Sequence, residues 1–169
     1  MRMRLLLCAA VLLLCFSTQV LAEDAGLYDG IFTGIATGDR GTSALLTLNL
    51  TQNGSAVKGI ATILPGIKVD TGGLICPGLV DVPAGTVPVK GNVSTRNPRV
   101  LIAASAIQTQ GMSIVADVLA EISPDGNSMR IQIRLKTPWP CRNPTIRADL
   151  TRMRGGSTQT QVSTSNRMR

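Results

Sequence analysis

The sequence predicts an all-β protein, an antiparallel up-and-down meander of about eight strands that closes into a small barrel. Apolar and polar side chains alternate with period two along most of the chain. Turn signals such as Asn53-Gly54 and Asp125-Gly126 separate the alternating runs. No long helical pattern follows the first 22 residues. A meander has two exposed edge strands, and closure into a barrel pairs them with each other.

Eight segments read as strands, and two hairpins carry the cleanest alternation. In chain order the expected strands cover residues 27–37, 43–51, 57–63, 86–94, 99–107, 112–122, 129–136 and 145–153. Pro88 within the fourth segment indicates an edge or a bulge, because proline has no N–H for the strand ladder. Residues 101–106 are a nearly continuous apolar run that is also compatible with a short helix.

Alternating loops of a meander lie at opposite ends of the barrel. The tight turns at 53–54, 95–98 and 125–126 then share one end, and the longer segments 65–85 and 137–144 share the other. These longer segments contain Cys76 and Cys141, which are the two cysteines that follow residue 22. The strand count therefore places both thiols at one end, and an oxidising compartment would join them in a disulfide.

The chain divides into three parts. Residues 1–22 have a basic start, the apolar run 5–16 and a small residue at the end, which is the layout of a secretory signal peptide cleaved after Ala22. An uncleaved anchor is the alternative, but the run has twelve residues and a bilayer-spanning helix needs about 20. Residues 23–154 form the predicted domain, and the polar segment 155–169 is predicted to be a disordered tail. We expect a secreted or periplasmic protein with no integral membrane segment after cleavage.

Composition excludes several classes of function. The chain contains no histidine, so Ser-His-Asp and Cys-His catalysis are absent, and two thiols alone do not complete a zinc site. Only Tyr28, Phe32 and Trp139 are aromatic after residue 22, which is too few to stack nucleic-acid bases. We therefore expect no enzyme, no cofactor, no metal and no nucleic-acid partner.

One hairpin and one short motif resemble those of a known class. The run 46–59, with Asn53-Gly54 at its turn, resembles hairpins of small exported calycin-type barrels, the class of lipocalins and avidins. The lipocalin motif on the first strand is Gly-x-Trp, and Gly30-Ile31-Phe32 has Phe in place of Trp. The resemblance implies a barrel architecture and transfers no ligand or binding residue.

Basic side chains concentrate in the C-terminal third, where residues 125–169 hold nine basic and two acidic residues. The candidate binding residues are Arg134, Lys136, Arg142, Arg147 and the neighbouring Trp139. Pairing the last two strands is expected to place Arg134 near Arg147 and Lys136 near Thr145. Like charges opposite each other are unfavourable, so their concentration indicates an anionic glycan, a lipid head group or an acidic protein as partner. A solvated, solubilising face is the alternative.

Three functional hypotheses follow. The first is a non-enzymatic binding module that uses the disulfide-pinned rim and the basic face. The second is a carrier of a small apolar ligand, because small residues at predicted inward positions leave space for one; they are Gly59, Ala61, Gly91, Ala116 and Ala120. The alternative is an interior that larger inward side chains such as Leu46, Leu48 and Ile131 fill. The third is an outer-membrane barrel, although three aromatic residues are too few to form the two aromatic girdles of such barrels. In a eukaryotic secretory pathway Asn49, Asn53 and Asn92 head glycosylation motifs.

Overall fold

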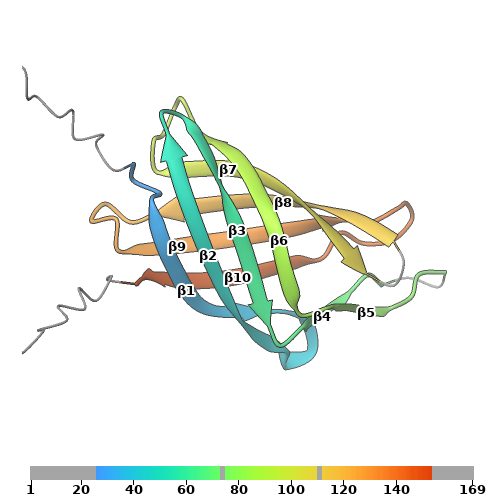
Figure 1. The fold of residues 1–169 in the computed structure, drawn as a ribbon. Helices are drawn as coiled ribbons and strands as arrows, with labels where there is room; N and C mark the ends of the chain where they lie inside the picture. The colour runs from blue at the N-terminus through green and yellow to red at the C-terminus, as the bar shows by residue number, and fades with distance from the viewer. Residues whose placement is uncertain (1–25, 73–74, 110–111, 154–169) are drawn as a thin grey trace, which may run out of the picture.

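A computed structural model describes residues 26–72, 75–109 and 112–153 and contains a closed antiparallel barrel of eight strands (Figure 1). The strand order around the barrel is β1-β10-β9-β8-β7-β6-β3-β2, so the last strand closes onto the first. The predicted fold class is confirmed. The predicted signal peptide and the predicted tail lie outside the described residues.

The eight expected segments correspond to the eight barrel strands. In chain order the elements are β1 (Gly30–Thr37), the 3-10 helix η1 (Asp39–Gly41), β2 (Ser43–Asn53), β3 (Ala56–Leu64), β4 (Ile67–Asp70), β5 (Leu79–Val82), β6 (Gly85–Val93), β7 (Val100–Thr109), β8 (Met112–Ile122), β9 (Ser128–Lys136) and β10 (Thr145–Arg152). Residues 101–106 lie in β7, so the helical alternative is wrong there. The hairpin of β4 and β5 falls inside the expected loop 65–85 and was not predicted.

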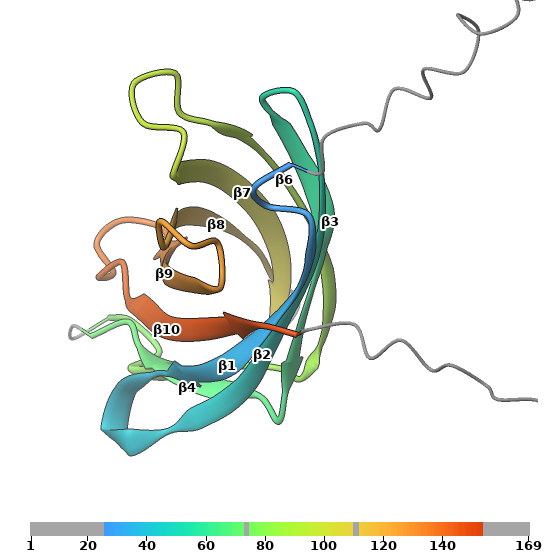
Figure 2. The same cartoon turned by 90° about the vertical axis from the view of Figure 1, so that its left-hand side faces the viewer.

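Alternation along each strand divides the side chains between the interior and the surface. On β2, Leu46, Leu48 and Leu50 are buried inside the barrel, while Leu45 and Asn49 are exposed. Viewed from the end with the tight turns, the strands surround one interior (Figure 2). A single apolar core therefore holds the fold together, since burial of each such side chain contributes roughly 1.5–3 kcal/mol.

Two inward glycines allow neighbouring strands to approach closely. A Cβ atom at Gly34 would collide with the carbonyl oxygen of Asp149 on β10, and one at Gly59 would collide with that of Asn49 on β2. Glycine at such points lets a strand coil tightly around a small barrel.

The end with the tight turns, called the closed end below, is plugged by side chains. Tyr28 and Phe32 are both 0 % exposed. The Arg152 guanidinium lies 4.5 Å from the centroid of the Phe32 ring and donates hydrogen bonds to the carbonyls of Leu27 and Gly126 at 2.6 and 2.8 Å. Arg152 thus links β10 to the segment that precedes β1 and to the β8–β9 turn.

The opposite end, called the rim, carries the longer loops, which extend beyond the barrel wall in Figure 1. The β4–β5 hairpin lies there and is tied to η1, because the Asp70 N–H donates to Asp39 Oδ2 at 2.6 Å. The Cys76 and Cys141 sulfurs are bonded, with their Cα atoms 5.6 Å apart. The prediction that both cysteines share one end and form a disulfide is confirmed.

Candidate functional site

An apolar pocket of about 380 Å³ opens at the rim between β6 and β7. Its inner wall is formed by Leu46, Ala61, Ile63, Ile133 and Ile146, and its mouth by segments 82–88 and 106–108. None of these described lining residues is charged, and the polar side chains among them are Thr86 and Gln108. The volume lies near the lower end of the 300–1,000 Å³ typical of small-molecule sites.

The pocket exists because the seam between β6 and β7 is only half paired. Their register runs from Lys90↔Ala104 to Val93↔Leu101 and does not continue toward the rim. The neighbouring pairs β3–β6 and β7–β8 do continue to the rim, so both flanking ladders are intact beside this gap.

Pro88 supplies the chemical reason for the open seam. The Ser105 hydroxyl donates to the Pro88 carbonyl oxygen at 2.8 Å, so this carbonyl faces β7. The N and C=O of one strand residue point to the same side, and therefore the ring nitrogen of Pro88 also faces β7, where it has no hydrogen to donate. The sequence predicted an edge or a bulge at Pro88. In the structure the barrel is closed, but β6 around Pro88 has no ladder partner on β7.

The barrel interior below the pocket is filled. A residual void of about 20 Å³ remains in the middle, between side chains that include Leu48, Val118 and Ile131. That space holds about one water molecule and no organic ligand. Of the predicted small inward residues, Ala61 lines the rim pocket, whereas Ala116 and Ala120 are packed in the core.

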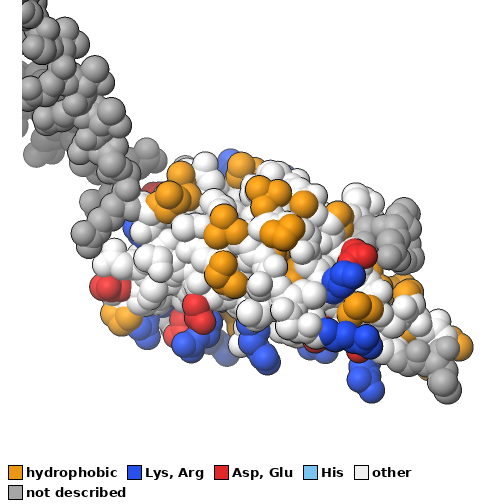
Figure 3. Space-filling view, turned by 90° about the horizontal axis from the view of Figure 1, so that it is seen from below, with side chains coloured by type: hydrophobic (Ala, Val, Ile, Leu, Met, Phe, Trp, Pro, Cys, Tyr) orange, Lys and Arg blue, Asp and Glu red, His pale blue; other side chains and the backbone are white. Residues whose placement is uncertain are grey.

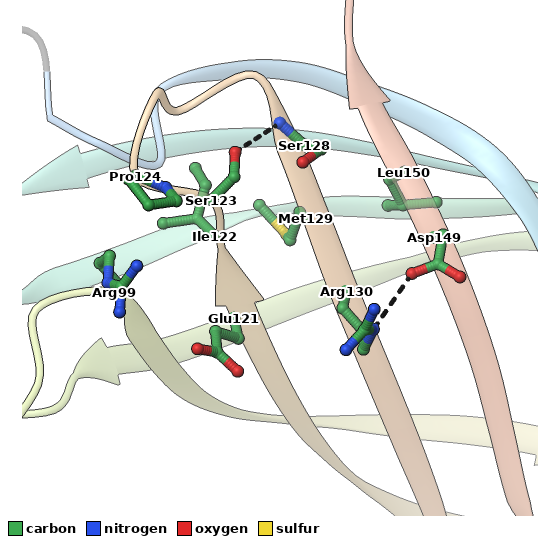
Figure 4. A pocket seen from close by; sticks show the side chains of 10 residues that line it. All are labelled: Arg99, Glu121, Ile122, Ser123, Pro124, Ser128, Met129, Arg130, Asp149 and Leu150. Carbon is green, nitrogen blue, oxygen red and sulfur yellow. Dashed lines mark hydrogen bonds and ion pairs between the residues drawn. The ribbon is translucent and has the colours of Figure 1, made fainter.

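A second depression, of about 240 Å³, lies on the outer surface at the closed end (Figure 4). Charges of opposite sign alternate across it, because the register pairs Glu121 with Arg130 and Arg130 with Asp149. Arg130 Nε lies 3.3 Å from Asp149 Oδ1, and both side chains are largely exposed. Cross-strand charge pairing explains this surface without a ligand.

Beside this depression lies a perturbed phenol. Burial, with a smaller contribution from the Glu121 carboxylate, raises the pKa of Tyr28 to about 12. The Tyr28 hydroxyl is buried and has no hydrogen-bond partner among the described residues. Its neutral form is therefore the stable one at any physiological pH.

The predicted basic face differs from expectation in register. Arg134 lies opposite Thr145, and Arg147 lies opposite Gln132, so the expected neighbours Arg134 and Arg147 are not paired and Lys136 does not face Thr145. Lys136 instead forms an ion pair with Asp117 at 2.8 Å. The expected placement of like charges opposite one another was wrong.

On the face drawn in Figure 3, hydrophobic side chains gather over the middle, and several Lys and Arg side chains lie along one edge. The outward positions of β9 and β10 carry Arg130, Arg134, Lys136 and Arg147. Exposed large apolar side chains lie on β1, β2 and β3 and also on β7 and β8; they are Ile31, Ile35, Leu45, Ile60, Leu64, Ile102, Val115 and Leu119. Arg134, Arg142 and Arg147 form no ion pair with any described carboxylate.

The remaining predicted site residues, Trp139 and Arg142, lie in the β9–β10 loop at the rim. The Trp139 side chain is exposed. The Arg142 N–H donates to the Thr71 carbonyl at 2.7 Å, which fastens this loop to the β4–β5 hairpin beside the disulfide. The structure thus brings Trp139 and Arg142 together and leaves Arg134 and Arg147 on the barrel wall.

Within residues 26–72, 75–109 and 112–153 no three Cys, Asp or Glu side chains cluster as metal ligands. The same residues include no helix that is long and apolar enough to cross a bilayer. Asn49, Asn53 and Asn92 are exposed, as predicted.

The fold and the site define a class: a small antiparallel eight-stranded β-barrel with an apolar pocket at its rim. Among solved structures, the chain is similar to a redesigned β-barrel, with 12 % sequence identity and a TM-score of 0.49 over 76 % of this chain and 93 % of the other. No protein-family model and no curated protein matches the sequence.

Proposed function

We propose that this protein is an exported carrier that binds a small apolar molecule, or the apolar end of an amphipathic one, in the rim pocket. The observation that carries the proposal is an uncharged pocket of about 380 Å³ with an opening beside Pro88. Burial of apolar ligand surface is favourable there because the lining offers no charge to desolvate.

Architecture supports the same function. Eight-stranded barrels are wide enough either to be filled by side chains or to hold one small ligand, as lipocalins and streptavidin do. This barrel combines the two arrangements, with a filled closed end and an open rim. The calycin-type likeness of Gly30-Ile31-Phe32 and the disulfide favour an exported member of such an architecture.

A binding titration tests the proposal. We expect dansyl-undecanoic acid to gain fluorescence on binding, and Ala61→Phe to lower its affinity at least about ten-fold, because the ring would occupy the pocket. Ala56→Phe is the matched control, since Ala56 lies on the same strand but is exposed. Equal affinity for the two variants would remove the pocket as the binding site.

A second candidate function is recognition of an anionic partner by the basic side of the barrel. Its specific support is that Arg134, Arg142 and Arg147 have no ion-pair partner among the described residues. Alanine at Arg134, Lys136 and Arg147 together is expected to weaken binding to heparin. A matched variant that changes Lys58, Lys90 and Arg96 to alanine removes the same number of positive charges from β3, β6 and the β6–β7 turn instead. If both variants elute alike, net charge rather than this face is responsible.

A further inference from the structure

The two most exposed large apolar side chains lie near the disulfide at the rim. Trp139 is 92 % exposed and Ile75 is 79 % exposed, and no other large apolar side chain in the described residues exceeds 60 %. Ile75 precedes Cys76, and Trp139 is two residues before Cys141, so the disulfide holds both within about 17 Å of each other. We call segments 75–78 and 137–144 the tip.

Hydrogen bonds within the β9–β10 loop hold Trp139 at the rim, away from the core. The Cys141 N–H donates to the Pro138 carbonyl at 2.9 Å, which places Trp139 inside a tight turn. The Thr137 hydroxyl donates to the Arg142 carbonyl at 2.7 Å. These two hydrogen bonds and the disulfide fix the loop in a conformation that presents Trp139 to solvent.

The contrast with the other aromatic residues is informative. Tyr28 and Phe32 are fully buried, whereas the remaining aromatic residue of residues 23–169 is presented to solvent. Tryptophan is enriched at membrane–water interfaces, where its ring meets apolar chains and its N–H meets water. An exposed tryptophan next to an exposed isoleucine therefore favours a bilayer surface as the partner.

The charge of the tip fits an anionic bilayer. Segments 75–78 and 137–144 contain no acidic residue, and their one charged side chain is Arg142. A cation beside inserted apolar side chains is attracted to anionic head groups by about 1 kcal/mol. We propose that the tip docks on lipid bilayers that contain anionic lipids, with Trp139 and Ile75 inserted at the interface.

The tip and the rim pocket are connected by one short strand. β5 (Leu79–Val82) leads from the tip directly into the segment 82–88 at the pocket mouth. Docking would bring the mouth close to lipid, so an acyl chain of a membrane lipid becomes the ligand class. This last step rests on the proposed carrier function, whereas docking itself does not.

Fluorescence measures docking at one site, because Trp139 is the only tryptophan in the chain. Vesicles of phosphatidylcholine with phosphatidylglycerol are expected to shift the Trp139 emission to shorter wavelength. On centrifugation the protein is expected to pellet together with the vesicles. Ile75→Ser should weaken the partition to vesicles about five-fold, since one apolar anchor is lost. Ile35→Ser, at an exposed position on β1, is the control and should leave it unchanged.

Unchanged emission with these vesicles would overturn the inference, and so would equal partition of Ile75→Ser and Ile35→Ser. All variants keep the same N- and C-terminal segments, so a difference in vesicle binding among them is caused by the substituted residue. The docking inference and the carrier proposal can be contradicted independently of each other. Ala61→Phe should abolish ligand binding and retain docking, whereas Ile75→Ser should retain binding of dansyl-undecanoic acid in solution.

Discussion

The strands alternate inward and outward side chains at both ends of the barrel, but the interior is filled at the closed end and open at the rim. At the closed end, large side chains such as Phe32 and Leu150 fill the interior, and Arg152 joins three chain segments over them. At the rim, smaller residues such as Ala61 face a seam that Pro88 keeps unpaired. The comparison indicates that close side-chain packing holds the closed end together, whereas the rim leaves a pocket open and is held by the disulfide and by contacts between its loops.

Removal of the disulfide should have the largest effect on stability. Cys76 and Cys141 are 65 residues apart in sequence, and closing such a loop contributes about 4 kcal/mol in the chain-entropy model. We expect Cys76→Ser with Cys141→Ser to lower the free energy of unfolding by this order in urea titrations. Hydrogen exchange should also accelerate in β4 and β5 before it does in β9. Uniform acceleration of both regions would contradict the division between the ends.

Truncation of a core residue should cost more at the closed end than at the rim. Leu150 is 1 % exposed, and Leu150→Ala should destabilise the protein by about 3 kcal/mol. Ile63 is only partly buried and lines the pocket, so Ile63→Ala should cost about 1 kcal/mol. Equal losses in denaturant unfolding would show that the rim is as tightly packed as the closed end.

Titration of Tyr28 should weaken the closed end at high pH. Its pKa is raised to about 12, whereas the unfolded chain ionises near 10. Between these values the unfolded state has lost the proton that the folded state retains, so the free energy of unfolding falls as pH rises, by about 2 kcal/mol in total.

The control for this titration is Tyr28→Phe. It removes a hydroxyl that has no partner among the described residues, so its stability at pH 7 should equal or exceed that of the parent. The difference between the two unfolding curves from pH 10 to pH 12 isolates the phenol. A constant difference would mean that the phenol titrates alike in both states.

Closing the seam should have the smallest effect on stability and a clear effect on binding. Pro88→Val restores an N–H that faces β7, so the ladder has a donor beyond Lys90. We expect a change in unfolding free energy within about 1 kcal/mol and a several-fold loss of affinity for dansyl-undecanoic acid. Asn92→Val, on the same strand but outside the pocket lining, leaves the backbone donors unchanged and is the control. Unchanged affinity of Pro88→Val would show that the unpaired β6–β7 seam is not required for ligand binding in the pocket.

Much of the fold could be predicted because burial acts on alternate residues. The run of Leu46, Leu48 and Leu50 identifies one face of a strand, and Asn53-Gly54 identifies the turn that follows it. The loop count placed Cys76 and Cys141 together without any knowledge of their distance. Pro88 was identified as an edge signal, although the pocket that it opens was not.

Two predictions missed because the pattern does not contain the needed information. The register of β9 and β10 differs from expectation by two residues, and such a shift keeps Arg134 and Arg147 on the same face. Hydrogen bonds within the loop decide it, including one from the Thr137 N–H to Asn143 Oδ1 at 3.0 Å. The β4–β5 hairpin was missed because each of its strands has only four residues between prolines and glycines.

The sequence by itself determined the strand class, the strand count of the barrel and which side chains are inside, because each depends on residues that are near one another in the chain. Only the tertiary structure decided where the interior stays open and through which contacts the loops at the rim are joined. Those features depend on Pro88 facing Ser105 and on Thr71 facing Arg142, which are contacts between residues distant in sequence. Local alternation is unchanged by such contacts, so no reading of the pattern alone contains them.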